Sequence, residues 1–98
     1  MLGLCLKEIR VNQTIIGAIQ QRHTLSFRYH GEHRTVEPHC YGSDKDGDAS
    51  LRAYQIGKGW RMFHLADMGP IQVGDQFQGP RQGYKRNDSA MAVIYAQL

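Results

Sequence analysis

Residues 25–39 constrain the fold more than any other part of the chain, because aromatic and cationic side chains alternate there around a glycine. Successive side chains of a strand point to opposite faces of the sheet. One face would then carry Leu25, Phe27 and Tyr29, and the other Ser26, Arg28 and His30. Gly31-Glu32 supplies a tight connection in which glycine adopts a positive φ. The run predicts a hairpin with one face for a core and the other for an anionic or aromatic ligand.

Length and composition indicate a single globular domain. The chain has 98 residues, of which 41% are hydrophobic and 21% are charged, so it can bury one core but not build separate catalytic and specificity domains. We divide it into a core over residues 14–78 and a C-terminal extension over residues 79–98. The net charge of +3 and the sequence pI of about 9.1 favour anionic partners without requiring them.

The cysteines and the hydrophobic runs predict a cytoplasmic protein. Cys5 and Cys40 are far apart and form no C-x-x-C pattern, so we expect neither a disulfide framework nor a zinc ribbon. No apolar run is long enough to span a membrane, and Met1 to Leu6 is too short for a signal sequence. We therefore expect no membrane partner.

Hydrophobic spacing and turn residues predict a mainly β (α+β) fold. A short helix is expected from Asn12 or Thr14 to Gln21 or Arg22, and a second from Asp88 to Gln97, where Met91, Ile94, Tyr95 and Leu98 have helical spacing. The expected strands are Leu25 to His30, His33 to His39 with pairing ended by Pro38, Ser50 to Ile56, Trp60 to Ala66, and Pro70 to Phe77. Residues 41–48 read as an exposed loop. About five short strands favour a small bent barrel, since closure removes exposed edges.

Several segments together resemble the WYL domain, a prokaryotic regulatory module. They are Ile15-x-x-Ala18-Ile19, Leu25-x-Phe27-x-Tyr29-x-Gly31, Arg34-x-Val36-Glu37-Pro38, Leu51-x-Ala53-Tyr54 and Trp60-Arg61-x-Phe63-x-Leu65-x-Asp67-Met68. Where the family has Trp-Tyr-Leu, this chain has Ala49-Ser50-Leu51, and His64 and Asp67 replace two arginines of the later strand. The resemblance implies an SH3-type, Sm-like barrel.

The same resemblance implies a function. WYL domains are usually fused to a DNA-binding domain and act as its sensor, with a nucleic acid or a nucleotide as the inferred ligand. No DNA-binding domain fits in this chain, so we expect a stand-alone, non-catalytic regulatory module. The alternative is a protein-interaction or dimerisation module that acts on a larger transcriptional or defence regulator. Its partner would then be that regulator or a second copy of the chain.

The candidate ligand-binding residues combine cations with aromatic rings, as single-strand binders do. They are Arg28, Arg34, Arg52, Arg61, Tyr54 and Phe63, with His39 as a further contact near neutral pH. Alternatively, the arginines are solvated or paired with Glu32, Glu37 or Asp67, and the aromatic rings fill the core. A second basic cluster, Arg81 to Arg86, either extends the binding groove or is a solvated linker.

Catalysis and metal binding have no matching motif. The sequence contains no triad, phosphate loop or positioned pair of carboxylates, so we expect no enzyme activity and no cofactor. The five histidines fit no zinc spacing. Residues 44–48 resemble the start of a calcium loop, but Ala49 and Gln55 stand where that loop needs Gly and Glu. We expect no metal site.

Overall fold

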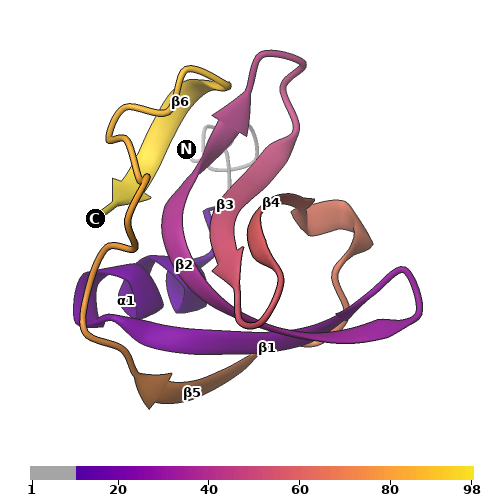
Figure 1. Cartoon of the computed structure of the whole chain (residues 1–98). Coiled ribbons are helices and arrows are strands. Elements are labelled where there is room, and N and C mark those ends of the chain that lie inside the picture. Colours follow the sequence, from indigo (N-terminus) through magenta and orange to yellow (C-terminus); the bar gives the residue numbers. More distant parts are fainter. Residues whose placement is uncertain (1–10) are drawn as a thin grey trace, which may run out of the picture.

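The computed structural model describes residues 11–98, and these form one helix and six antiparallel strands in a single bent sheet (Figure 1). The elements are α1 (Gln13–Gln21), β1 (His23–Tyr29), β2 (Glu32–Asp44), β3 (Ala49–Gln55), β4 (Gly59–His64), the 3₁₀ turn η2 (Leu65–Asp67), β5 (Gln72–Gln76) and β6 (Met91–Gln97). The mainly β class is confirmed. Cys5 and the amino-terminal segment considered as a signal sequence lie outside the described residues.

Strand β2 organises the sheet because it has two different neighbours along one edge. Its first half pairs with β1, from Tyr29↔Glu32 to Leu25↔Val36, and its second half pairs with β6, between Cys40 and Asp44. Its other edge pairs with β3 from Val36 to Ser43. In Figure 1, β6 lies along the upper part of β2 on the side away from β3.

The expectation that Pro38 ends pairing is wrong. Pro38 pairs with Ala53 and Cys40 with Arg52, so the register shifts by one residue at His39 and β2 continues to Asp44. A bulge tolerates proline because the missing N–H would not have served a regular ladder there. Half of the segment expected as an exposed loop is therefore strand.

The β1–β2 hairpin is closed by His30 and Gly31, which have φ of 49° and 82°. Two successive positive φ values define a type I′ turn, whose twist matches that of the flanking strands. The expected two-residue turn is thus present one residue earlier than Gly31-Glu32. The imidazole of His30 stacks on Tyr29 with ring centroids 4.2 Å apart. This contact stabilises a positive φ, which is rare for residues other than glycine.

Helix α1 covers the core, as its apolar stripe predicts. The Asn12 Oδ1 accepts a hydrogen bond from the backbone N–H of Ile15 at 3.0 Å, and Arg22 ends the helix in the left-handed conformation. Such an N-cap stabilises a helix by about 1 kcal/mol. The helix buries Ile15, Ala18 and Ile19 against a core that includes Leu25, Phe27, Val36, Tyr41, Leu51 and Phe63.

The expected C-terminal helix is wrong, because residues 91–97 form strand β6. The spacing of Met91 and Ile94 fits a helix, but the run Val93-Ile94-Tyr95 is β-branched and aromatic and pairs well on a sheet. Its position depends on Gly42 of β2, where an added Cβ would collide with the backbone carbonyl of Val93. Glycine therefore permits β6 to approach β2 closely.

The expectation of a closed barrel is also too strong. The strand order is β4-β3-β2-β1-β5, with β6 attached to β2, so β4 and β5 are outer strands of an open sheet. The segment after η2 crosses back to β1, where Met68 forms an isolated bridge with Tyr29. Strand β5 is exposed over all five residues and, among residues 11–98, pairs with β1 alone. Within residues 11–98, no helix is long and apolar enough to cross a membrane.

Candidate ligand site on the outer face of the sheet

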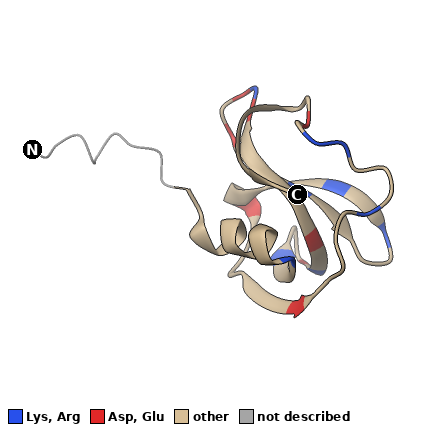
Figure 2. Cartoon of the chain, turned by 90° about the vertical axis from the view of Figure 1, so that its left-hand side faces the viewer, with Lys and Arg blue, Asp and Glu red and all other residues tan. Residues whose placement is uncertain are grey.

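The strand register divides the four candidate arginines between the two faces of the sheet. Arg34 pairs with Phe27, and Arg61 pairs with Ala53, so these two arginines share the face of the core. Arg28 follows Phe27 and Arg52 precedes Ala53 in the sequence. Both therefore lie on the opposite, outer face. The structure therefore does not gather the four guanidinium groups on one wall, and Figure 2 shows charged positions spread over several strands and loops.

Arg34 is a buried structural residue. Its Nη1 donates to the Gln55 Oε1 at 3.2 Å and its Nη2 to the Tyr29 carbonyl at 3.3 Å. The Glu32 carboxylate lies 3.5 Å from Nη2, and the guanidinium lies 5.7 Å from the centroid of the Tyr29 ring. Its Nε is buried and has no partner among the described residues. These contacts fix the end of the first hairpin to β3.

Phe63 does not offer a stacking surface, which corrects the sequence expectation. The side chain is completely buried, and its ring makes edge contacts with Phe27 at 5.2 Å and with Tyr29 at 4.9 Å. Edge-to-face packing of this kind stabilises a core beyond the area it buries. Of the other predicted arginines, Arg28 and Arg61 are exposed. Arg28 donates to the Gly31 carbonyl at 2.8 Å.

A segment without regular secondary structure, residues 77–90, connects β5 to β6 across the outer face; we call it the strap. Arg81 anchors it: its Nε and Nη2 donate to the two carboxylate oxygens of Glu37 at 2.6 and 3.1 Å. The same guanidinium lies 4.4 Å from the centroid of the Tyr54 ring. Glu37 thus has the structural ion pair considered from the sequence, but with a partner from the strap.

His39 lies under the strap because of the bulge in β2. Having no pairing partner in β3, it directs its ring to the outer face, where it is completely buried. Its Nδ1 bonds to the Glu37 carbonyl at 2.8 Å, and its Nε2 accepts from the backbone N–H of Arg81 at 3.0 Å. An N–H can only donate, so Nε2 is unprotonated and the ring is neutral. Burial lowers the pKa of His39, and the Arg81 charge adds to this lowering, whereas Glu37 opposes it.

An aromatic and cationic groove, the strap groove, lies between the strap and strands β3 and β4. Its volume is about 340 Å³, and its lining residues include Arg52, Trp60, Tyr84, Lys85, Arg86 and Asp88. The rings of Trp60 and Tyr84 stack with centroids 5.9 Å apart and planes 24° apart. The Trp60 Nε1 donates to the Gln82 carbonyl at 3.3 Å and the Tyr84 hydroxyl to the His39 carbonyl at 3.1 Å. These bonds fix both rings at the groove.

The ionisable groups of the strap groove are held in defined states. The Arg52 Nε donates to the Asp88 Oδ2 at 2.7 Å. Burial alone would raise the pKa of Asp88, but the hydrogen bonds from Arg52 and from the Ala90 N–H lower it overall. Burial raises the pKa of Tyr84 to about 12, so its phenol stays neutral. Three cations and one carboxylate line the groove, which leaves it positively charged.

A larger groove of about 770 Å³ is lined by Arg81 and by residues of β5 and the start of the strap. Its charged lining residues are Glu37, Asp75 and Arg81, and its apolar ones include Ile56 and Phe77. Because Glu37 and Arg81 neutralise each other, Asp75 leaves this groove with a weak negative charge. It therefore has the opposite electrostatic character to the strap groove.

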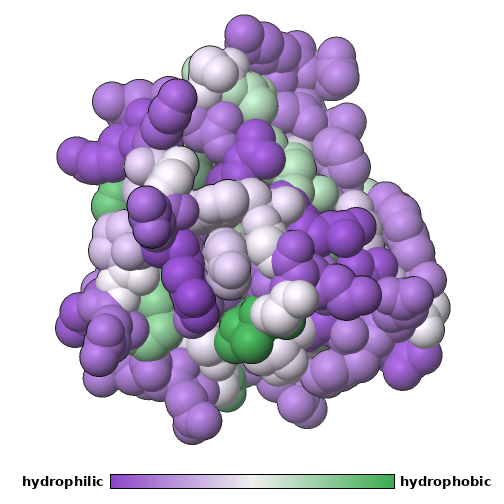
Figure 3. Space-filling view, in the orientation of Figure 1, coloured by the Kyte–Doolittle hydropathy of each residue, from purple (hydrophilic) through white to green (hydrophobic). Residues whose placement is uncertain are grey.

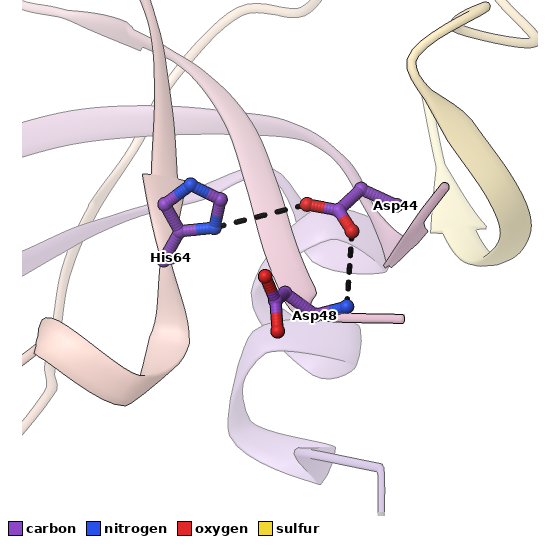
Figure 4. Close-up of side chains that lie close together, drawn as sticks. All are labelled: Asp44, Asp48 and His64. Carbon is purple, nitrogen blue, oxygen red and sulfur yellow. Dashed lines mark hydrogen bonds and ion pairs between the residues drawn. The ribbon is translucent and has the colours of Figure 1, made fainter. Parts of the chain in front are cut away.

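Asp44 and Asp48, at the tip of the β2–β3 hairpin, lie close to His64 at the end of β4, with potential ligand atoms within 4.8 Å of one another (Figure 4). The Asp44 Oδ1 accepts from the backbone N–H groups of Asp46 and Asp48, each at 2.9 Å, and the Ser50 Oγ lies 3.1 Å from Oδ2. These bonds, that from Asp48 foremost, lower the pKa of Asp44. The Asp44 carboxylate therefore stabilises the turn by accepting hydrogen bonds on both of its oxygens.

Sequence reasoning missed the residues that shape the strap groove. Trp60 appeared only as a strand residue and within a segment that resembles the WYL domain, and Tyr84 only within the basic cluster that could be a solvated linker. The spacing of Tyr54 and Trp60 around the Gly57–Gly59 turn could have indicated this cluster, because the two residues pair across the β3–β4 hairpin. Of the predicted residues, the structure brings together Arg52, Tyr54 and His39 under the strap.

Comparisons with known proteins place this geometry in a context. No protein-family model matches the chain, and no curated protein matches it. Among solved structures, the chain is similar to proteasome accessory factor B/C (PafBC) of Arthrobacter aurescens, with 28% sequence identity and a TM-score of 0.65. The similar region covers 76% of this chain but only 13% of the PafBC chain. This likeness supports a WYL-like domain.

Proposed function

We propose that the chain is a non-catalytic regulatory module that binds a nucleotide or single-stranded nucleic acid in the strap groove. The supporting observation is the stacked pair of Trp60 and Tyr84 beside Arg52, Lys85 and Arg86 in one groove. Aromatic rings stack on bases whatever their sequence, each stack contributing about 1–3 kcal/mol, and the neighbouring cations neutralise phosphates. The likeness to PafBC, a proteasome accessory factor, supports the regulatory part of the proposal.

The size and charge of the groove fit this class of ligand. A volume of about 340 Å³ lies at the lower end of the range for small-molecule sites, roughly 300–1,000 Å³. A single base with its phosphate fits such a space better than a duplex. Asp88 already satisfies one side of Arg52, so Lys85 and Arg86 supply most of the free positive charge.

The proposal assigns the predicted arginines different roles. Arg52 lines the groove, where its bond to Asp88 orients it. Arg34 fixes the hairpin, while Arg28 and Arg61 lie outside the groove lining. Tyr54 and His39 support the strap from beneath rather than contact the ligand.

A titration with a fluorescein-labelled single-stranded oligonucleotide, followed by anisotropy at several salt concentrations, tests this function. Each phosphate contact contributes about −0.7 to the slope of log K against log salt concentration. The Lys85→Ala and Arg86→Ala variants should each weaken binding and make the slope shallower by about that amount. Arg28→Ala is the matched control, because Arg28 is exposed away from the groove. Absence of binding at low salt, or equal losses in all three variants, would contradict the proposal.

Trp60 gives a second readout of the same site. It is the single tryptophan of the chain, and stacking of a base on its indole should quench its fluorescence in proportion to occupancy. AMP is the probe for a nucleotide and the unlabelled oligonucleotide is the probe for nucleic acid. Quenching by the oligonucleotide alone would favour a nucleic-acid ligand, whereas quenching by both would favour base recognition as the common element.

A protein-interaction module is the second candidate. It is favoured by the small part of PafBC that the chain matches. It is also favoured by the outer strands β4 and β5, which have one edge unpaired within residues 11–98 and could pair with another chain there. Against it, the face seen in Figure 3 is largely hydrophilic with only small hydrophobic areas. Val73 on β5 and Val93 on β6 are about half exposed. Light scattering should show self-association that Val73→Lys or Val93→Lys removes if either strand is an interface.

A further inference from the structure

His39 joins the strap to the sheet through both nitrogens of its ring. Nδ1 bonds to the Glu37 carbonyl on β2 itself, and Nε2 accepts the Arg81 N–H from the strap. The ring is also enclosed by aromatic groups: its centroid lies 4.6 Å from that of Trp60, 5.9 Å from that of Phe77 and 4.9 Å from that of Tyr84. A neutral imidazole with one donor and one acceptor matches this environment completely.

We propose that His39 is a pH-sensitive latch, and that its protonation releases the strap from the outer face of the sheet. Imidazolium carries a proton on both nitrogens and accepts no hydrogen bond. Its new Nε2–H would point at the Arg81 N–H, so that two donors face each other in a buried site. The bond that holds the strap backbone to β2 would be lost, and a positive charge would be buried among three aromatic rings.

The charges around the ring determine the direction of the switch. The titratable groups that face His39 are Glu37 on β2, with Arg81 and Tyr84 on the strap; Trp60 on β4 and Phe77 on the strap are neutral. Burial lowers the pKa of His39 below its ordinary value of 6.5, and Arg81 acts in the same direction, while Glu37 acts against them. The strap is therefore closed at neutral pH.

The sign of the pH dependence follows from linkage. The closed state binds the His39 proton more weakly than the open state, so closure is fully favoured above the ordinary pKa. The contribution of neutral His39 to closure is lost as the pH falls through the lowered pKa. Between the two pKa values, the population of the open strap relative to the closed one rises about tenfold for each unit by which the pH falls.

The latch would regulate the strap groove, and this consequence rests on the proposed function. The strap supplies Tyr84, Lys85 and Arg86 to the groove lining, while β3 and β4 supply Arg52 and Trp60. Opening the strap would separate the two sides of the groove. Ligand affinity should then fall on acidification, even though extra positive charge would by itself strengthen binding of an anion.

The latch is tested without any ligand, on the full chain. Ring ¹⁵N NMR gives the tautomer and the pKa of His39, and amide hydrogen exchange at several pH values gives the opening of residues 79–90. Exchange of these amides, corrected for the intrinsic effect of pH, should increase about tenfold for each unit of pH below 6.5 until His39 is fully protonated. Amides of β1, β2 and β3 should stay protected, because the hairpins do not depend on the latch.

Two variants separate the latch from a general effect of acid. His39→Gln offers a donor and an acceptor without titrating, so its strap should open independently of pH. His33→Gln, which changes an exposed histidine of the same strand, should behave as the wild type. If His39→Gln does not fold, the wild-type ring NMR and the exchange of residues 79–90 decide the matter alone.

The outcomes distinguish this proposal from the proposed function. Strap opening that follows the titration of His39 supports the latch even if no nucleotide binds. Ligand binding without such opening supports the proposed function and overturns the latch. The latch is also overturned if His39 titrates while the strap stays protected, if His39→Gln opens with the same pH dependence as the wild type, or if the whole sheet opens together with the strap.

Discussion

Arg81 and Glu37 are 44 residues apart in sequence and form a two-point ion pair, with Nε to Oε1 and Nη2 to Oε2 distances of 2.6 and 3.1 Å. The Glu37 side chain is only 8% exposed, whereas that of Arg81 is 44% exposed. Removing the arginine therefore leaves a buried carboxylate without a counter-charge, which is more costly than removing the whole pair.

We expect Arg81→Ala to lower the free energy of unfolding more than the double variant Glu37→Gln/Arg81→Ala does. Urea denaturation followed by Trp60 fluorescence measures both. Arg28→Ala controls for the loss of a surface guanidinium, because Arg28 is exposed and donates to the nearby Gly31 carbonyl. Equal destabilisation by the single and the double variant would show that the buried carboxylate does not depend on Arg81.

Gly42→Ala should destabilise the domain by about 1–3 kcal/mol, the usual cost of adding a methyl group where there is no space. The new Cβ would collide with the Val93 carbonyl and push β6 away from β2. Gly17→Ala is the matched control: nothing lies within 4 Å of its added Cβ, and the change should stabilise α1 by about 0.5–1 kcal/mol. Thermal unfolding checks both, and a neutral Gly42→Ala would contradict the close approach of the two strands.

Phe63→Ala should destabilise the domain by about 3–5 kcal/mol, as expected for a completely buried aromatic ring. Phe63→Leu retains most of the volume and should cost less, and it should leave oligonucleotide affinity unchanged. Denaturant unfolding and the anisotropy titration measure the two effects separately. A large loss of affinity in a well-folded Phe63→Leu would restore the interpretation of Phe63 as a binding residue.

The Asp44 carboxylate should make the hairpin tip sensitive to acid. Hydrogen bonds to its oxygens, first that from the Asp48 N–H, lower its pKa below the ordinary value of 3.8. Its stabilising contribution is therefore present above that value and is lost as the pH falls through the lowered pKa. Asp44→Asn should reduce stability at neutral pH and flatten its dependence on acid, as followed by urea midpoints. Asp46→Asn is the control, since only the backbone of Asp46 bonds to Asp44.

The hairpins were predictable because their signals are local. Alternation around Gly31 located β1 and β2, and the Gly57–Gly59 turn located β3 and β4, because each pairing joins neighbours in sequence. The N-cap and apolar stripe of α1 are equally local. Hydrophobic periodicity and turn chemistry contain enough information for such elements.

The C-terminal part was not predictable in the same way. Strand β6 is extended because it pairs with β2, about 50 residues earlier in the chain. The pairing requires a residue without a Cβ at Gly42. The bulge at Pro38 and Cys40 depends on the same long-range pairing. A short run such as residues 91–98 fits both helical and extended periodicity, and tertiary pairing decides between them.

The sequence predicted the residue types found around the strap groove better than it predicted their arrangement. Cations combined with aromatic rings were expected, and Arg52 and Tyr54 do lie near the groove. The one-residue bulge directs His39 to the outer face, and the strap supplies Tyr84, Lys85 and Arg86 from a segment with no periodic pattern. Neither effect leaves a local signature in the sequence.

The shared edge of β2 divides the molecule into parts with different folding requirements. Pairing with β1 and β3 closes short loops and carries a small entropic cost, whereas pairing with β6 must close a loop that includes β3, β4, β5 and the strap. The first three strands can therefore assemble early, with the last strand docking onto a preformed template. We therefore expect β6 to detach more readily than the sheet formed by β1, β2 and β3 comes apart, since its pairing closes the longest loop.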